Sequence, residues 1–178
     1  MSVWFWSFLF FSFLGYLLEK GYAAVTHAVQ QNRKCFILLP LCPVYGLAVT
    51  TVLMLPSTLL ENPWTLLTAS AFVPCIVEYL IHLYYECCFR VRYWDYRGLP
   101  LQLHGRICLP FALAWTALMP IAVLVIAPRV LPVLAAVSPW LSFAVWMLFA
   151  ADWLLSRYML WRCRDTERLR LGRILAGL

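Results

Sequence analysis

The chain has 178 residues, of which 64% are hydrophobic and 12% are charged, and its formal net charge is +6. Soluble domains carry roughly 25% charged residues, and a chain of this length cannot bury so much apolar surface in water. The composition therefore excludes a soluble enzyme or nucleic-acid-binding domain and predicts a multi-pass membrane protein solvated by lipid.

Five apolar stretches are long enough to cross a bilayer, since a crossing helix needs about 20 residues. The first lacks the Lys or Arg that precedes the apolar core of a signal peptide and is longer than such a core, so we expect it to remain in the mature protein. The predicted spans are Val3–Val29, Val44–Leu60, Trp64–Phe89, Ile107–Pro128 and Val130–Trp161, the last of which crosses from near Pro139 onward.

The first connection contains the sequence LLPLCPVYG, residues 38–46. Pro40 and Pro43 fix the backbone angle φ, and Gly46 permits a tight bend as the chain returns to the membrane. The segment is either a short re-entrant element packed against the bundle or a stiff turn into the second span.

The third span carries a polar face in an otherwise apolar helix. Glu78, His82 and Glu86 are spaced four residues apart, which places them on one side of a helix. This spacing matches neither the Glu-x-x-His pairs of di-iron sites nor the His-Glu-x-x-His motif of zinc enzymes. We therefore expect no metal, and the absence of nucleotide-binding and serine-nucleophile motifs predicts no cofactor and no catalytic residue.

The third connection, residues 90–110, is rich in aromatic and basic residues. Two interpretations are open: it anchors to lipid headgroups, or it caps a polar cavity in the bundle. In the second case its gating residues are Asp95, Gln102, His104 and Arg106.

The basic residues predict the orientation of the spans. Twelve of the 14 Lys and Arg residues fall in the first connection, the third connection and the C-terminal region. The positive-inside rule then places the N-terminus outside and the C-terminus in the cytosol, with anionic inner-leaflet lipids as partners. We expect one transmembrane helical domain over residues 1–161 and a basic tail, residues 162–178, that is either an amphipathic surface helix or frayed.

Ionisable residues occur at similar depth in the first, third and fifth spans. Glu19, Glu78, His82 and Asp152 lie ~10–17 Å from the cytosolic ends, at about 1.5 Å per helical residue. A charged side chain in hydrocarbon costs about 2.5–3.5 kcal/mol, so these groups should face the bundle interior.

Two roles are open for this polar layer. In the first, the residues pair with one another and hold the helices together. Lys20 would then pair with Asp152 or Glu78. Glu19 would then pair with His82. In the second, Glu19, Glu78, His82, Glu86 and Asp152 form a substrate- or ion-binding site that opens to the cytosol.

Several of these segments together resemble one family of small bacterial membrane proteins. The matching segments are Gly15-x3-Glu19, Pro43-Val44-Tyr45-Gly46, Glu78, Glu86, Trp94-Asp95-Tyr96, Pro100-x-Gln102-Leu103-x-Gly105-Arg106-Ile107 and Trp115. They resemble the family described as putative ABC-transporter type IV, or CmpB-like, from Gly15 to Trp115, while the last two spans match only in hydropathy. This chain has Arg97 where the family pattern has Ser, and Gln102 where it has Asn.

The resemblance implies a permease subunit of the bacterial cytoplasmic membrane that works with a separate ATPase. It carries site roles over to Glu19, Glu78, Glu86, Asp95 and Arg106. Because five spans are few for a transport path, a homodimer or a partner is expected.

Three functions are therefore open. The favoured hypothesis is a permease-like transporter subunit with a polar site in the cytosolic half of the bundle. The alternatives are an intramembrane enzyme acting on a lipid-linked or amphiphilic substrate, with Glu78 as general base, and a non-catalytic membrane partner or sensor.

Overall fold

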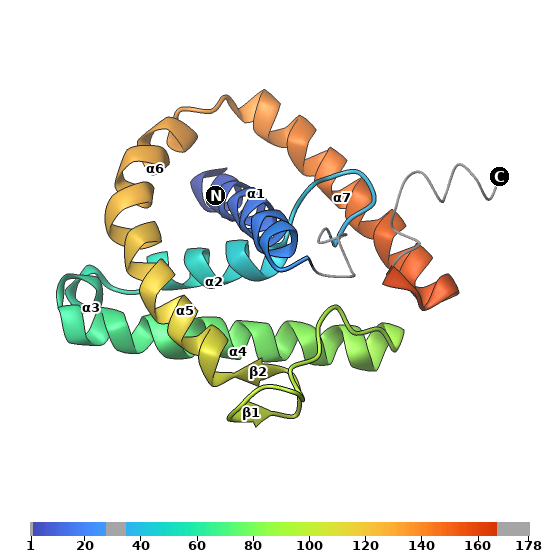
Figure 1. Ribbon diagram of the computed structural model, residues 1–178. Coiled ribbons are helices and arrows are strands. Elements are labelled where there is room, and N and C mark those ends of the chain that lie inside the picture. The colour runs from blue at the N-terminus through green and yellow to red at the C-terminus, as the bar shows by residue number, and fades with distance from the viewer. Residues whose placement is uncertain (1, 28–34, 167–178) are drawn as a thin grey trace.

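The computed structural model describes residues 2–27 and 35–166 and confirms the all-α class (Figure 1). The helices are α1 (Ser2–Val25), α2 (Pro43–Leu53), α3 (Ser57–Glu61), α4 (Pro63–Phe89), α5 (Leu109–Pro120), the π-helix η1 (Ile121–Ile126), α6 (Ala127–Ala135) and α7 (Pro139–Cys163). One short antiparallel hairpin, β1 (Gln102–Leu103) and β2 (Ile107–Cys108), lies between α4 and α5.

Four helical stretches in the described residues are long and apolar enough to cross a membrane. They contain 23 to 27 residues each and cover Val3–Val25, Pro63–Phe89, Leu109–Ala135 and Pro139–Cys163. At about 1.5 Å per residue, each exceeds the roughly 30 Å of a bilayer core. The chain is a membrane protein built as a helical bundle.

The second predicted span is wrong as a continuous helix. The sequence predicts it over Val44–Leu60, but α2 ends at Leu53 and α3 begins only at Ser57. Pro56 separates the two helices, because proline cannot donate the backbone hydrogen bond that would continue the helix. The 11 residues of α2 span about 16 Å, half of a bilayer core.

The fourth span extends beyond its predicted end at Pro128. Helix α5 passes through η1 into α6, which ends at Ala135. The wider π-helical turn begins directly after Pro120, where the missing N–H interrupts the α-helical hydrogen bonds. The fifth span begins at Pro139, as predicted, and runs to Cys163.

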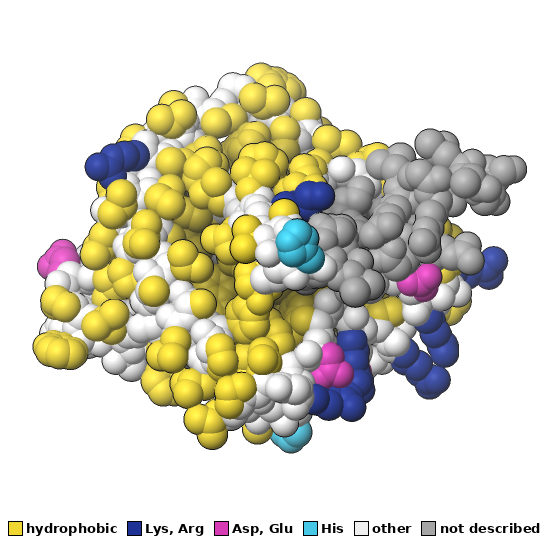
Figure 2. Space-filling model, in the orientation of Figure 1, with side chains coloured by type: hydrophobic (Ala, Val, Ile, Leu, Met, Phe, Trp, Pro, Cys, Tyr) yellow, Lys and Arg dark blue, Asp and Glu magenta, His cyan; other side chains and the backbone are white. Residues whose placement is uncertain are grey.

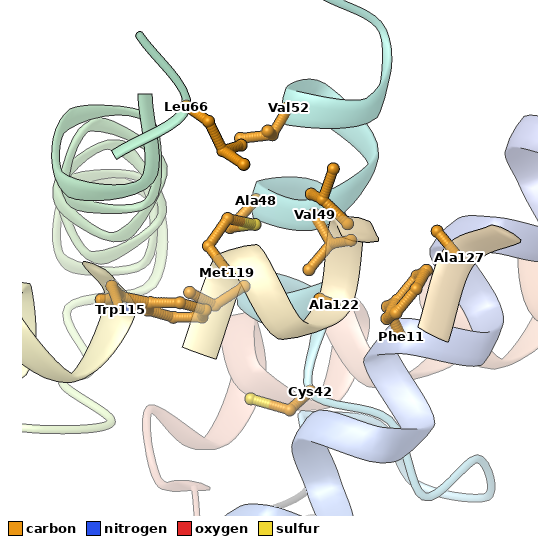
Figure 3. Close-up of a cluster of buried hydrophobic side chains, with 12 residues drawn as sticks. Phe11, Cys42, Ala48, Val49, Val52, Leu66, Trp115, Met119, Ala122 and Ala127 are labelled. Atoms are coloured by element: carbon orange, nitrogen blue, oxygen red, sulfur yellow. The ribbon is translucent and has the colours of Figure 1, made fainter. Parts of the chain in front are cut away.

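Helix α1 lies in the middle of the molecule, with α2, α6 and α7 around it (Figure 1). The main core forms where α1, α2, α4 and the α5–η1–α6 stretch meet (Figure 3). There Trp115 and Met119 of α5 belong to the same buried cluster as Ala48 of α2, and Phe11 of α1 lies beside Ala127. The core is therefore at the centre of the bundle.

The outer surface is apolar. Hydrophobic side chains cover most of the face in Figure 2, and several Lys and Arg side chains gather near the C-terminal ends of α4 and α7. Helix α7 exposes large residues, including Trp140 at 85% and Phe143 at 62%. Such a surface is solvated by lipid.

The predicted tail helix lies mostly outside the described residues, as do Arg33 and Lys34 of the first connection.

Two glycines let α1 and α2 pack closely. A Cβ at Gly15 would overlap the ring of Tyr45, and one at Gly46 would overlap Ser12 Oγ and the Phe8 carbonyl oxygen. Small residues at such positions allow helix backbones to approach in membranes. The contact at Gly15 seats Tyr45 against α1.

The segment before α2, residues 35–42, lies beside the middle of α1, and most of its residues are buried or half-buried. The Cys42 N–H donates to the Ser12 carbonyl oxygen at 3.0 Å, about halfway along a helix long enough to cross the bilayer. Phe36 is 2% exposed. The first connection therefore carries irregular backbone to the middle of α1 before α2 begins, and irregular backbone at membrane depth must be covered by protein.

Candidate functional site

The polar face of α4 anchors the loop that follows it. Tyr96 donates its hydroxyl hydrogen to Glu78 Oε1 at 2.8 Å. One turn further on, His82 Nε2 lies 3.1 Å from the Trp94 carbonyl oxygen, which can only accept, so the nitrogen donates. The four-residue spacing of Glu78 and His82 therefore lets one face of α4 bind the loop that lies across it.

Glu86 binds the same loop through two arginines. It accepts from Arg106 Nη2 at 2.7 Å and forms an ion pair with Arg92. Its hydrogen bond raises the pKa of Arg106 above the usual value, so this guanidinium stays charged. The backbone oxygen of Arg106 accepts from Trp94 Nε1 at 2.9 Å, and Arg106 Nη1 donates to Tyr79 at 2.8 Å.

Beneath this loop lies a cavity of about 330 Å³. Its wall combines residues of α1, α2, α4, the start of α5 and residues 93–99. Its acidic lining residues are Glu19, Glu78 and Asp95, and its aromatic lining residues are Tyr22, Tyr45, Tyr93, Trp94, Tyr96, Phe111 and Trp115. The volume is at the lower end of the roughly 300–1,000 Å³ of small-molecule sites.

Each of the two deeper carboxylates is held by a tyrosine. Tyr45 of α2 donates to Glu19 Oε1 at 2.9 Å, as Tyr96 does to Glu78. Glu78 is 6% exposed. Burial, followed by the negative charge of Glu78, raises the pKa of Tyr96, so its phenol keeps its hydrogen for the carboxylate.

Aromatic contacts join the wall between these carboxylates. Tyr96 stacks on Phe111 with 4.8 Å between ring centroids, and Tyr22 meets the edge of Phe111 at 6.0 Å. On the α2 side, the rings of Tyr45 and Trp115 lie 4.7 Å apart. Aromatic rings thus form the wall between Glu19 and Glu78.

Asp95 and Tyr93 contribute in different ways to the same cavity. The side chain of Asp95 is 45% exposed and pairs with Arg97, whose Nε lies 3.4 Å away. Gly105 approaches this pair so closely that an added Cβ would lie 2.8 Å from Asp95 Oδ1. The buried hydroxyl of Tyr93 has no hydrogen-bond partner in the described part of the chain.

Asp152 lies away from this cavity. Its carboxylate accepts from the N–H groups of Ile37 at 3.2 Å and Leu38 at 3.1 Å, and from Leu39 at 2.7 Å. Ser156 adds a further hydrogen bond at 3.3 Å. Asp152 is fully buried and supplies acceptors to the backbone N–H groups of a segment that is neither helix nor strand.

The other two predicted loop residues belong to the hairpin. Gln102 Oε1 accepts from the Gly105 N–H at 2.5 Å, which closes the turn. His104 is exposed, with its Nδ1 3.0 Å from the Tyr79 hydroxyl. Neither lines the cavity.

The predicted pairings within the polar layer are wrong. Lys20 is exposed, and no ion pair joins it to Asp152 or Glu78 in the described residues. His82 pairs with Glu86, 3.8 Å away, rather than with Glu19. The reason is that nearer groups take these side chains: the N–H groups of residues 37–39 bind Asp152. Tyr96 and Trp94 of the loop after α4 bind Glu78 and His82. Across residues 2–27 and 35–166, no three His, Cys, Asp or Glu side chains converge on a metal position.

Sequence reasoning missed the aromatic wall. Tyr45 and Tyr96 stand inside two of the motifs, Pro-Val-Tyr-Gly and Trp-Asp-Tyr, but neither was proposed as a site residue. The hydroxyl group within each motif was the available signal. For Tyr22 and Phe111 the sequence holds no such signal, because aromatic residues are common throughout this chain.

One family model matches the chain. The family is described as "Putative ABC-transporter type IV", and the match covers residues 6–157. It includes the whole cavity and extends beyond the segment from Gly15 to Trp115 that carries the recognisable motifs. No curated protein and no solved structure matches this chain.

Proposed function

We propose that this chain, which belongs to the putative ABC-transporter type IV family, is a permease-like transporter subunit. Its solute would bind in the cavity between Glu19 and Glu78. The observation that carries this proposal is the placement of two carboxylates, from two membrane-length helices, on one aromatic-walled cavity.

The depth of these carboxylates supports a solute site. Glu19 lies six residues before the end of α1 and Glu78 eleven before the end of α4, about 9 and 17 Å along each helix axis. Ionisable groups at such depth are expensive and typically line substrate or ion pathways. A purely structural network would need no cavity around them.

The half-length helix supports the same proposal. Helix α2 begins beside the cavity, which is lined by its N-cap Cys42 and by Val44 and Tyr45. Transporters commonly build their sites near the bilayer midplane where a helix is interrupted. Interrupted backbone is tolerated there because protein covers it or a cavity solvates it.

A separate ATPase would supply the energy. The sequence contains no Gly-x4-Gly-Lys-Ser/Thr loop and so cannot cradle ATP phosphates in the usual way. The surface proposed for the ATPase is the basic end of the bundle near α4 and α7. A second copy of the chain and anionic lipids are further proposed partners at this membrane.

The test is a mild-detergent purification of the tagged full chain from its native membrane, with mass spectrometry of the bound proteins. A stoichiometric ATPase whose hydrolysis depends on the chain supports the proposal. Recovery of the chain alone, or only with itself, at a detergent concentration that preserves other ABC complexes in the same membrane would refute it.

A further inference from the structure

We propose that the crevice between the C-terminal ends of α4 and α7 binds the phosphate group of an anionic lipid. The inference gives a defined site to the anionic lipids named above as partners, and it rests on that part of the proposed function. It is independent of the solute cavity and of the ATPase.

The two helix ends form the crevice because hydrophobic side chains hold them together. Phe89 and Val91 at the end of α4 share a buried cluster with Leu160 of α7. Just beyond this cluster each helix ends at an arginine in the left-handed conformation, Arg90 with φ 58° and Arg164 with φ 50°. The packing therefore brings two arginines that are far apart in the sequence to one end of the bundle.

The crevice has a volume of about 560 Å³, and more basic than acidic residues line it. Several Lys and Arg side chains gather at this end of the molecule in Figure 2. The described lining residues are Glu86, Arg90, Val91, Arg92, Arg164, Asp165 and Thr166. Three guanidinium groups and two carboxylates thus share the crevice.

Two of these guanidinium groups are available to an anion. Glu86 is bound by Arg92 and Arg106. Neither Arg90 nor Arg164 forms an ion pair in the described part of the chain, and both are exposed. A guanidinium group always carries its charge and binds phosphate oxygens through paired N–H donors. A phosphate group in the crevice would therefore meet a positive charge from each helix end.

The surroundings of the crevice favour a lipid over a soluble phosphate compound. Near the end of α7, Tyr158 is 56% exposed and Trp161 is 61% exposed, and such rings are enriched at the level of lipid headgroups. About two turns before the end of this helix, Arg157 lies over the rings of Phe89 and Trp153. Basic pockets between membrane helices bind anionic headgroups, and this crevice has the same composition and place.

The experiment compares short-chain phosphatidylglycerol with phosphatidylcholine of the same chain length. The purified full chain in a neutral detergent is titrated with each lipid, and native mass spectrometry counts the lipids bound to each chain. Phosphatidylglycerol should occupy one site at least tenfold more tightly, because no choline group cancels the charge of its phosphate. Equal binding of the two lipids, or binding of neither, would overturn the proposal.

Glycerol 3-phosphate separates a lipid from a soluble phosphate compound, because it carries a phosphate on glycerol but no acyl chains. At an equal concentration it should leave phosphatidylglycerol bound. Displacement of the lipid at that concentration would assign the crevice to soluble phosphate compounds and refute the lipid proposal.

Variants locate the site. Arg90→Gln and Arg164→Gln should each weaken phosphatidylglycerol binding fivefold or more. The matched control is Arg162→Gln, since Arg162 lies in the last turn of α7 and is exposed but does not line the crevice. An equal loss in the control would indicate a diffuse attraction between the basic surface and the lipid and would contradict the proposal. The comparison of the two lipids on the unaltered chain decides the proposal even if a variant fails to fold.

The ATPase proposed above would dock on this same end of the bundle, and the arginine variants separate the two partners. Loss of lipid binding with the ATPase still recovered in the purification supports the proposal. If the variants lose the ATPase but keep phosphatidylglycerol, the crevice is a protein contact and the lipid proposal is wrong. A failure of lipid binding on the unaltered chain leaves the purification test of the transporter proposal intact.

Discussion

At the scale of single residues, the site is built from pairs of a carboxylate and a tyrosine. Tyr45 reaches Glu19 from α2, and Tyr96 reaches Glu78 from the loop after α4. Each pair joins two separate elements, so the hydrogen bond orients the carboxylate and also closes the wall. The polar residues therefore hold separate elements together and also line the proposed solute site.

Removing one hydroxyl tests this double role. Tyr96→Phe leaves the ring stacked on Phe111 but takes the hydrogen bond from the buried Glu78. We expect a loss of about 1–3 kcal/mol in the free energy of unfolding, measured by denaturation in detergent. Tyr158→Phe, at a tyrosine that is 56% exposed, should change it by less than about 0.5 kcal/mol. An equal effect of both changes would argue against the pair.

Asp152 is a second residue whose role depends on its partners. Asp152→Asn replaces a charged acceptor of three backbone N–H groups with an amide that offers one oxygen. Hydrogen bonds to charged groups contribute about 1.5–3 kcal/mol each, so we expect the free energy of unfolding to fall by about that amount. Hydrogen exchange should rise at residues 37–39. Unchanged exchange at these amides would show that the carboxylate does not hold the segment.

At the scale of elements, the contact between α1 and α2 determines where α2 lies. Gly46→Ala inserts a methyl group where Ser12 and the Phe8 carbonyl already lie. Overpacking of this kind costs about 1–3 kcal/mol, and a shift of α2 would also move Tyr45. Gly21→Ala, with nothing within 4 Å of the added Cβ, should instead stabilise the chain by about 0.5–1 kcal/mol. Thermal unfolding of the two variants measures the difference.

The loop after α4 is the other element that forms the cavity. Arg106→Gln removes its hydrogen bonds to Glu86 and Tyr79 and should increase hydrogen exchange over residues 92–106 at least tenfold. Arg129→Gln is the matched control, because Arg129 bonds only to the Val125 carbonyl of its own helical stretch in the described residues. Similar exchange in the two variants would mean that the arginine does not fasten the loop.

At the scale of the whole molecule, the structure brings the first connection, the third connection and the end of α7 together. Ile37, Phe89, Val91 and Leu160 share one buried cluster. These are the segments that the basic residues assign to the cytosolic side. The positive-inside rule therefore predicts that this end of the bundle faces the cytosol.

Labelling of single cysteines tests the orientation. In a chain whose other cysteines are replaced, Ser138→Cys places a thiol between α6 and α7, while the native Cys163 marks the opposite end of α7. We expect a membrane-impermeant maleimide to label the first in intact cells and the second only after permeabilisation. The reverse pattern would invert the predicted topology.

The sequence alone determined the kind of molecule and most of its helices. Apolar length predicts a crossing helix because the bilayer core has a fixed thickness, and residues four apart share a helix face whatever surrounds them. Both are local properties, so the face of Glu78, His82 and Glu86 and the start of the last helix at Pro139 could be predicted.

Only the tertiary structure decided the partners of those residues. Tyr45 bonds to a residue 26 positions away, and Asp152 bonds to amides 113 to 115 positions away. Hydropathy and residue spacing do not predict such pairings, because the pairings depend on how closely the helices approach and where the loops lie. Packing between distant segments determines the half-length α2, the anchored loop and the aromatic cavity. The sequence therefore contains the residues of the candidate site but does not show how they are arranged.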